Sequence, residues 1–380
     1  MNDDLFVECQ GRLKRTWLAM EEKDFDFLLV YAGGKREMQR MDGVRYLTGY
    51  SGLGDHSLLL VRKQEMPILY VNPPDVSDIA KEEAVLGEVI GEEDFVARAV
   101  HDLKARKPGN GRIGFVGQEF MPAGLFQKLS GQITGSLCVD HDFLKRVGRS
   151  KTPWEIERIQ RAHRMADAGF LHMVEVAKPG MREFELSAEL ERALRMQGAR
   201  DNFGLVASSK HNPAIRPPTD KKLETGDLII AEISPECDGY FAQLCRTIVL
   251  GEPSEILREK FELLKVALRK GIQAARPGAP AVEVARAINR ILEEAGYEAY
   301  CKPPYMRSRG HGLGQGSPFP GNLSEEDGVV LEEGMTFIIH PNQYIPETGY
   351  LMLGETCEVT QNGGKSFSSL AQDIFSTHGI

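Results

Sequence analysis

Two patterns of apolar and polar residues alternate along the first part of the chain. Apolar positions recur with helical spacing over Leu5–Glu22, and short apolar runs indicate strands at Phe25–Tyr31, Ser57–Val61, Ile68–Val71 and Ile113–Val116. This alternation of helix and strand predicts an α/β domain at the start of the chain.

A strong helix start marks the beginning of the second part. Thr152 and Glu155 have the spacing of a capping box, and Pro153 suits the first position of a helix. We therefore place the boundary just before this helix, which gives an N-terminal domain at 1–148 and a C-terminal domain at 149–380.

A weak internal repeat predicts that the second part has two similar halves. Ala177-Lys178-Pro179-Gly180 precedes a helix that ends at Gly198, and the related Ala275-Arg276-Pro277-Gly278 precedes one that ends at Gly296, at an offset of 98 residues. Each copy follows a longer helix and precedes a β-rich stretch. Two such halves, related by a pseudo-twofold axis, place a cleft at their interface.

Four polar residues in this second part lie within or next to apolar or glycine-rich runs. Glu232 lies inside an apolar run, His340 ends another, Glu355 follows a third, and His311 lies in a glycine-rich stretch. Unpaired polar groups in buried strands cost about 1–3 kcal/mol when uncharged and more when charged. The simplest arrangement therefore directs these side chains toward one another, a metal ion or a polar ligand.

Composition limits the class of partner. The chain of 380 residues has a net charge of −9, which disfavours nucleic acid and anionic membranes as partners, and 42% hydrophobic residues, enough for two cores. Six cysteines are spread without a Cys-x-x-Cys pair, and no run of about 18 apolar residues occurs. We expect a cytoplasmic protein with reduced thiols that binds a small molecule.

Short motifs with glycine and charged residues follow one another through most of the chain. They include Val44-Arg45-Tyr46-Leu47-Thr48-Gly49-Tyr50, Gly226-Asp227-Leu228-Ile229-Ile230, Gly310-His311-Gly312-Leu313-Gly314, Gly334-Met335-Thr336-Phe337 and Gly354-Glu355-Thr356-Cys357-Glu358. In order and spacing they resemble the creatinase/prolidase/methionine aminopeptidase family. The resemblance implies an α/β N-terminal domain, an α+β C-terminal domain with the pita-bread fold and its pseudo-twofold repeat, and hydrolase activity.

The same resemblance implies where a metal centre would lie. The five ligands of the family's two-ion centre, which are two Asp, one His and two Glu, map onto Glu232, Gln243, His311, His340 and Glu355. Three of the five positions are therefore substituted. Two neighbouring ions need bridging carboxylates to offset their repulsion, and this set has too few. We expect no metal or one divalent ion, and not a dinuclear site.

Two chemistries fit this set. In the first, which needs no metal, Glu232 and Glu355 bind a guanidinium or amidine, and His311 or His340 acts as the acid–base group. Arg216 holds a substrate carboxylate. This creatinase-like hydrolysis of a C–N bond in a small guanidine, cyclic amidine or related amide is our first expectation.

In the second chemistry, His311, His340 and Glu355 bind a single metal ion, with Gln243 as a weak further ligand and Glu232 as the general base. This arrangement would suit an Xaa-Pro-type dipeptidase or aminopeptidase. A third alternative is a non-catalytic binding protein that uses the same cleft.

Tyr240 and Gln243 are further candidates for substrate contact. Each candidate also has a purely structural interpretation. Glu232 would then form a buried ion pair with Arg246, His340 would pair with Glu355, and nearby Cys245 would be a packed thiol.

The resemblance also implies a homodimer, because relatives of this branch close one subunit's cleft with the other's N-terminal domain. The loop over Thr48–His56 is the segment expected to reach the partner's site.

Overall fold

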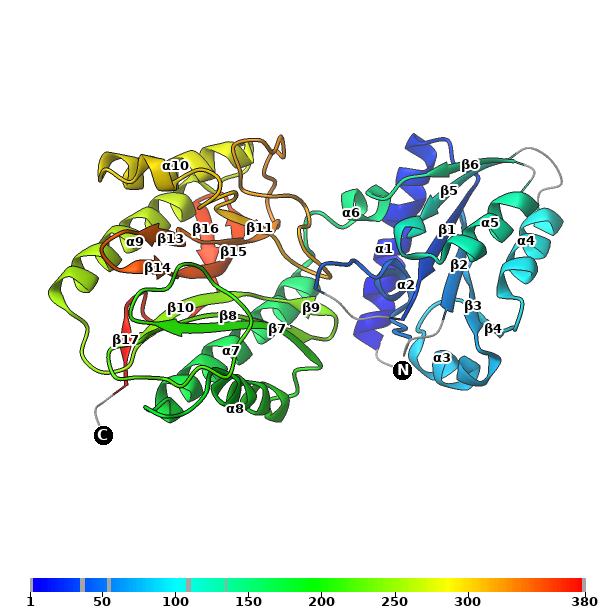
Figure 1. Ribbon diagram of the computed structural model, residues 1–380. Helices are drawn as coiled ribbons and strands as arrows, with labels where there is room; N and C mark the ends of the chain where they lie inside the picture. The colour runs from blue at the N-terminus through cyan, green and yellow to red at the C-terminus, as the bar shows by residue number, and fades with distance from the viewer. Residues whose placement is uncertain (1–2, 35–37, 53–55, 107–110, 134, 378–380) are drawn as a thin grey trace. The chain divides into compact units, whose positions relative to one another are not determined.

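The chain divides into two compact units in the computed structural model, and each is described by itself (Figure 1). The structure describes residues 3–34, 38–52, 56–106, 111–133 and 135–377. The units are Met1–Arg149 and Ser150–Ile380, so the division lies one residue beyond the boundary expected from the sequence. In the loop expected to reach a partner, residues 53–55 lie outside the described residues, and the homodimer stays a prediction.

The described part of the N-terminal unit builds one mixed sheet with the strand order β4-β3-β2-β1-β5-β6. Its strands are β1 (Phe27–Ala32), β2 (His56–Arg62), β3 (Ile68–Asn72), β4 (Glu88–Gly91), β5 (Arg112–Val116) and β6 (Ser136–Val139). The sequence predicted all but the two edge strands, β4 and β6. These two are only partly buried, so they lack the apolar runs that mark the central strands.

Helices cover both faces of this sheet. They are α1 (Asp3–Glu22), α2 (Gly43–Thr48), α3 (Ser77–Glu83), α4 (Phe95–Arg106), α5 (Ala123–Gln132) and α6 (Phe143–Val147), with 3-10 turns η1 (Pro74–Val76) and η2 (Gln118–Phe120). Side chains alternate between the faces along β1: Leu28 packs in one core with Leu13 of α1, and Leu29 packs in the other with Val100 of α4. The expected α/β domain is confirmed.

The C-terminal unit contains two helix pairs and a second mixed sheet. The helices are α7 (Pro153–Val176), α8 (Glu183–Met196), α9 (Glu255–Ala274) and α10 (Ala281–Glu294), with the 3-10 turn η3 (Glu298–Tyr300). The strands are β7 (Asp201–Ser209), β8 (Leu228–Cys237), β9 (Tyr240–Phe241), β10 (Leu244–Val249), β11 (Gly310–Gly312), β12 (Thr336–Ile339), β13 (Gln343–Ile345), β14 (Gly349–Leu351), β15 (Gly354–Thr360), β16 (Gly363–Ser366) and β17 (Phe375–Ser376).

The predicted repeat corresponds to the two helix pairs. Both ends of α10 follow those of α8 by 98 residues, and each of these helices comes after a longer one, α7 or α9. The expected capping box at the start of α7 also forms, because the Thr152 hydroxyl accepts from Glu155 N while the Glu155 carboxylate accepts from Thr152 N. The pita-bread architecture with its two related halves is confirmed.

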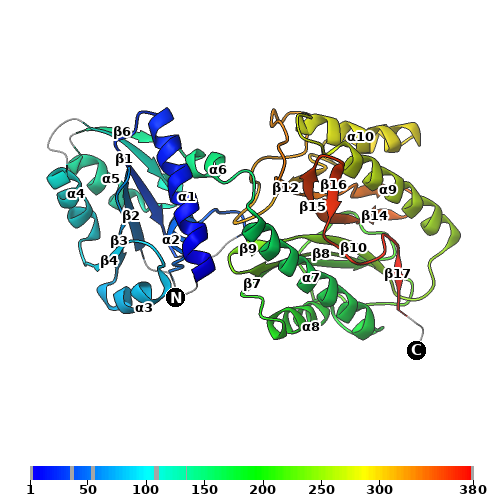
Figure 2. The ribbon, with the colours of Figure 1, turned by 180° about the vertical axis from the view of Figure 1, so that it is seen from behind.

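The main path of this sheet runs β11-β12-β15-β10-β8-β7, and the helices lie on its outer side (Figures 1 and 2). Ile233 and Leu244 pack in one core with α7 and α8, and Phe337 and Ile339 pack in another with α9 and α10. Leu244 pairs across the strands with Glu355, which pairs with Ile339, so both helix pairs cover the same sheet face. The opposite face of these strands carries polar side chains such as Glu232 and His311 beside apolar ones such as Ile230 and Ile338. Among the described helices, none has the length and apolar character needed to span a membrane.

Candidate functional site

Strand register gathers several polar side chains on the inner face of the sheet. Glu232 of β8 lies directly opposite Cys245 of β10, and Cys245 lies opposite Gly354 of β15. Residues paired in this way project to the same face. His340, at the end of β12, joins them, since a Cβ built on Gly354 would lie 2.6 Å from the His340 Cβ. The ring of His311 on β11 lies with its centroid 6.3 Å from that of His340.

Glu232 is the carboxylate of this inner-face cluster. Burial raises the pKa of its side chain to about 7, although a hydrogen bond from Gln243 opposes that shift. A carboxyl group with this pKa is divided between its protonated and ionised forms near neutral pH. It can therefore both accept and return a proton during a reaction.

The two imidazoles of the cluster are neutral near pH 7. Burial lowers the pKa of His311, and burial together with the neighbouring His311 and Arg309 lowers the pKa of His340 to about 3. His311 Nδ1 lies 2.8 Å from Ser317 Oγ. By contrast, His340 Nδ1 and the buried Gln243 Oε1 have no hydrogen-bond partner among the described residues. Two such atoms on one face are suited to a polar ligand.

Two further residues of the cluster were missed in the sequence. Asn342 Nδ2 lies 3.7 Å from Cys245 Sγ. Burial raises the pKa of the Tyr350 phenol, and electrostatic interactions with Cys245 and Glu232 raise it further, so Tyr350 stays protonated. Strand alternation did not mark Tyr350, because β14 ends at Leu351 and β15 begins only at Gly354.

Glu355 does not belong to this cluster, which corrects the sequence-based assignment. It pairs in register with Leu244 and therefore projects to the helix-covered face. There its Oε1 accepts from Arg246 Nη2 at 2.6 Å, and its Oε2 accepts from Ser366 Oγ at 2.6 Å and Gln372 Nε2 at 3.0 Å. The predicted set of His311, His340 and Glu355 is therefore not brought together.

The purely structural pairings expected for Glu232 and His340 do not form. Arg246 forms a buried ion pair with Glu355 and not with Glu232. His340 does not pair with Glu355, because the two side chains lie on opposite faces of the sheet. Cys245 is fully buried, and burial raises the pKa of its thiol well above the usual value, as expected for a packed thiol.

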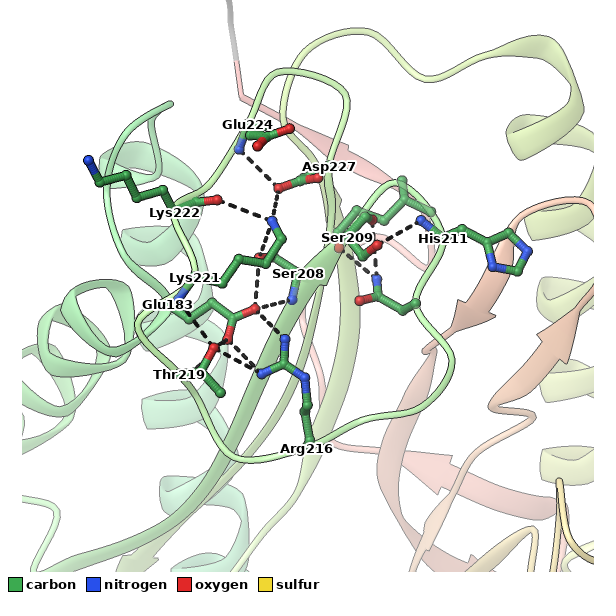
Figure 3. A network of polar contacts seen from close by, with 12 residues as sticks. Glu183, Ser208, Ser209, His211, Arg216, Thr219, Lys221, Lys222, Glu224 and Asp227 are labelled. Atoms are coloured by element: carbon green, nitrogen blue, oxygen red, sulfur yellow. Dashed lines mark hydrogen bonds and ion pairs between the residues drawn. The ribbon is translucent and has the colours of Figure 1, made fainter.

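Arg216 is held by an ion pair outside the cluster, and its role as a substrate-carboxylate ligand stays a prediction. Its Nη1 and Nη2 donate to the two carboxylate oxygens of Glu183 at 2.8 and 2.9 Å. Figure 3 shows this guanidinium enclosed by Glu183, Thr219 and Ser208, while His211 points away from them. Burial raises the pKa of Glu183, but hydrogen bonds from Arg216, Thr219 and Ser208 outweigh it and lower the value to about 2.

Tyr240, another expected substrate contact, also lies outside the inner-face cluster. The side chain is buried, its hydroxyl donates to Glu155 Oε1 at 2.9 Å, and its ring meets Trp154 edge-on. These contacts join β9 to the first turn of α7. Gln243 remains on the inner face, through its hydrogen bond to Glu232.

The donor set of the inner face does not fit a two-ion centre. It offers one carboxylate, one amide and two imidazoles, and Gly354 supplies no side chain between Cys245 and His340. Within the described ranges, no group of three or more His, Cys, Asp and Glu side chains is placed to hold a metal ion. One carboxylate cannot offset the charge of two adjacent divalent ions.

Comparison with known proteins agrees with this fold. The model of metallopeptidase family M24 matches residues 157–361, and that of the creatinase/prolidase N-terminal domain matches residues 12–149. An Xaa-Pro dipeptidase of Pyrococcus horikoshii is 29% identical over 369 residues, which cover 96% of this chain and 98% of the relative. An Xaa-Pro dipeptidase of Pyrococcus furiosus is 33% identical over 236 residues, covering 61% of this chain and 67% of the relative.

Solved structures show the same architecture. The prolidase from Pyrococcus furiosus superimposes with a TM-score of 0.79 at 28% identity, over 93% of this chain and 99% of that one. An Xaa-Pro dipeptidase from Bacillus anthracis gives a TM-score of 0.85 at 24% identity, over 97% and 99% of the two chains. The two family models, which together match most of the chain, show that it belongs to metallopeptidase family M24, a family of hydrolases, and carries a creatinase/prolidase N-terminal domain.

Proposed function

We propose that this protein hydrolyses the amide C–N bond of a small Xaa-Pro-type dipeptide with Glu232 as the acid–base group and without a two-ion centre. The observation that carries the proposal is the inner-face cluster. It joins a carboxyl group of pKa about 7 to the neutral imidazoles of His311 and His340. The Xaa-Pro dipeptidases among the relatives support the substrate class.

The first expectation, a guanidine or amidine substrate, loses its physical basis. It required Glu232 and Glu355 to bind one cation from two sides. Glu355 instead lies on the opposite sheet face and accepts hydrogen bonds from Arg246, Ser366 and Gln372. A peptide needs only one acid–base carboxyl group beside hydrogen-bond donors, and the inner face provides both.

The proposed reaction uses only side chains of this chain. Ionised Glu232 takes a proton from a water molecule as the water oxygen bonds to the carbonyl carbon of the peptide. Tyr350, which stays protonated, donates a hydrogen bond to the carbonyl oxygen as negative charge develops there. Glu232 then returns its proton to the leaving nitrogen, the C–N bond breaks, and a carboxylic acid and an amine are released.

The neutral imidazoles have a positioning role in this scheme. His340 Nδ1 has no protein partner in the described part of the chain, and His311 Nδ1 is oriented by Ser317. An uncharged imidazole both donates and accepts a hydrogen bond, which suits it to orient a water molecule or a peptide group.

The test is hydrolysis of Xaa-Pro dipeptides by protein dialysed against chelator, with metal content measured on the same sample. We expect turnover that survives dialysis and falls at least 100-fold in Glu232→Gln. Glu252→Gln, at a largely exposed carboxylate, is the matched control and should keep full turnover. Activity lost on dialysis and restored with two ions per protomer would overturn the proposal. Tight dipeptide binding without turnover in the untreated wild type would favour the binding-protein alternative.

A further inference from the structure

Three tyrosines, which we call the tyrosine wall, pack against one another in the C-terminal unit. Tyr300 ends η3, Tyr305 follows in the next loop, and Tyr344 is the central residue of β13. The ring centroids are 4.9 Å apart for Tyr300 and Tyr305, and 5.5 Å apart for Tyr344 and each of the others. Tyr305 is 44% exposed and the other two are half-buried, so the wall presents aromatic surface to a ligand.

A buried glutamine holds the wall in place. Gln343 Nε2 donates to Tyr300 O at 2.9 Å and to Tyr344 O at 3.0 Å, and its Oε1 accepts from Arg309 Nη2 at 2.9 Å. One side chain therefore fixes the backbone at two of the three tyrosines. An aromatic surface that is already ordered loses little conformational entropy when a ligand binds.

The tyrosine wall is continuous with the inner-face cluster. Tyr344 lies directly opposite Tyr350 in the β13–β14 hairpin, so both side chains are on the same side of it. Asn342, two residues before Tyr344, contacts Cys245 Sγ, and Cys245 lies opposite Glu232. A ligand whose peptide group reaches Glu232 therefore has the wall on its flank.

We propose that the tyrosine wall binds an aromatic or bulky apolar side chain of the substrate, and that Tyr305 and Tyr344 select such residues in the dipeptide. The inference rests on the proposed dipeptide hydrolysis. Aromatic rings attract other rings through edge-to-face and offset stacking, and they bury large apolar areas.

The charge behind the wall distinguishes this ligand from a cation, which aromatic faces also attract. The buried guanidinium of Arg309 donates to Asn289 Oδ1, Asn342 O and Gln343 Oε1, which are all neutral acceptors. Its positive charge is therefore not cancelled by a directly bonded carboxylate. This charge opposes a cation at the wall and leaves a neutral ring or aliphatic side chain favoured.

The test is calorimetric binding of Phe-Pro and Gly-Pro to the full chain carrying Glu232→Gln, which prevents turnover during the titration. We expect Phe-Pro to bind about tenfold more tightly than Gly-Pro, in line with the worth of an aromatic contact. Adding Tyr305→Ala or Tyr344→Leu should remove most of that difference and leave Gly-Pro affinity unchanged. Phe184→Ala, at an exposed aromatic on α8, is the matched control and should preserve the difference.

The outcomes separate this inference from the hydrolase proposal. Equal affinities for the two dipeptides, no binding of either one, or a Phe-Pro preference that persists in both tyrosine variants would overturn the role of the wall. Selective binding of Phe-Pro that depends on Tyr305, in a protein whose wild type does not hydrolyse it, would uphold the wall and remove only the hydrolase proposal.

Discussion

Gly354 and His340 lie so close that a Cβ on Gly354 would be 2.6 Å from the Cβ of His340. The side chain of Cys245 closes the same space from the neighbouring strand, 3.3 Å from that Cβ position. No side chain larger than hydrogen fits between them without movement of the strands. The position of the His340 side chain on the inner face therefore requires glycine at position 354.

The first prediction follows from this contact. Gly354→Ala should lower the free energy of unfolding by about 1–3 kcal/mol, because the methyl group overpacks against His340 and Cys245. Urea denaturation measures the change. Gly124→Ala in α5 is the control, since nothing lies within 4 Å of its Cβ position, and alanine there should stabilise by about 0.5–1 kcal/mol. Equal stability of Gly354→Ala and wild type would mean that the two strands lie farther apart than described.

The second prediction concerns Glu232 and pH. Its pKa of about 7 exceeds the ordinary 4.5, so the folded state holds a proton that the unfolded state releases between these values. Stability should therefore fall as pH rises from about 4.5 to 7, by on the order of 3 kcal/mol for this group. Glu232→Gln removes this loss and should be more stable than wild type at pH 8 and similar to it at pH 4.5.

Chemical denaturation of both proteins at the two pH values measures this effect. The comparison between variant and wild type cancels the other titrating groups. A stability difference that does not change with pH would contradict the buried, proton-sharing state of Glu232.

The third prediction concerns the ion pair of Glu183 and Arg216. The pKa of Glu183, about 2, lies below the ordinary 4.5, so its stabilisation is complete above about pH 4.5 and is lost as pH falls toward 2. Arg216→Ala should lower the free energy of unfolding at pH 7 by about 1–3 kcal/mol, because it removes two hydrogen bonds from a buried carboxylate.

Thermal unfolding across pH 2–7 tests this pair. The destabilisation by Arg216→Ala should shrink as the pH approaches 2, where Glu183 becomes protonated in both proteins. Arg290→Ala, which removes a highly exposed guanidinium of α10, is the control and should change stability little. If Arg216→Ala acted mainly on dipeptide affinity and left stability intact, the residue would be a substrate ligand after all.

The fourth prediction concerns the buried pair of Arg246 and Glu355. Removing one partner, as in Glu355→Leu, leaves Arg246 buried beside neutral acceptors and should cost about 3–5 kcal/mol. The double change Arg246→Met with Glu355→Leu removes both charges and should recover most of that loss. Equilibrium denaturation of the two single variants and the double variant gives the coupling energy. Additive losses would show that the pair is not coupled.

Much of the fold was predictable from local signals in the sequence. The capping box at Thr152 and Glu155 placed the start of α7, and the repeated Pro-Gly segments placed α8 and α10 at the same offset of 98 residues. Such signals act over a few neighbouring residues and do not depend on the rest of the chain. The partly buried strands β4 and β6 lacked them, because their side chains meet solvent as much as core.

Residue types also identified Glu232, His311 and His340 as unusual polar groups, and the structure places all three on one face. What only the tertiary structure decided was the register of the strands. Side chains alternate along a strand, so neighbouring residues point to opposite faces of the sheet. Gly354 therefore faces the inner side and Glu355 faces the helices. The surroundings of Arg216 and Tyr240 also depended on the tertiary structure. Their partners, Glu183 and Glu155, lie on helices distant in the sequence.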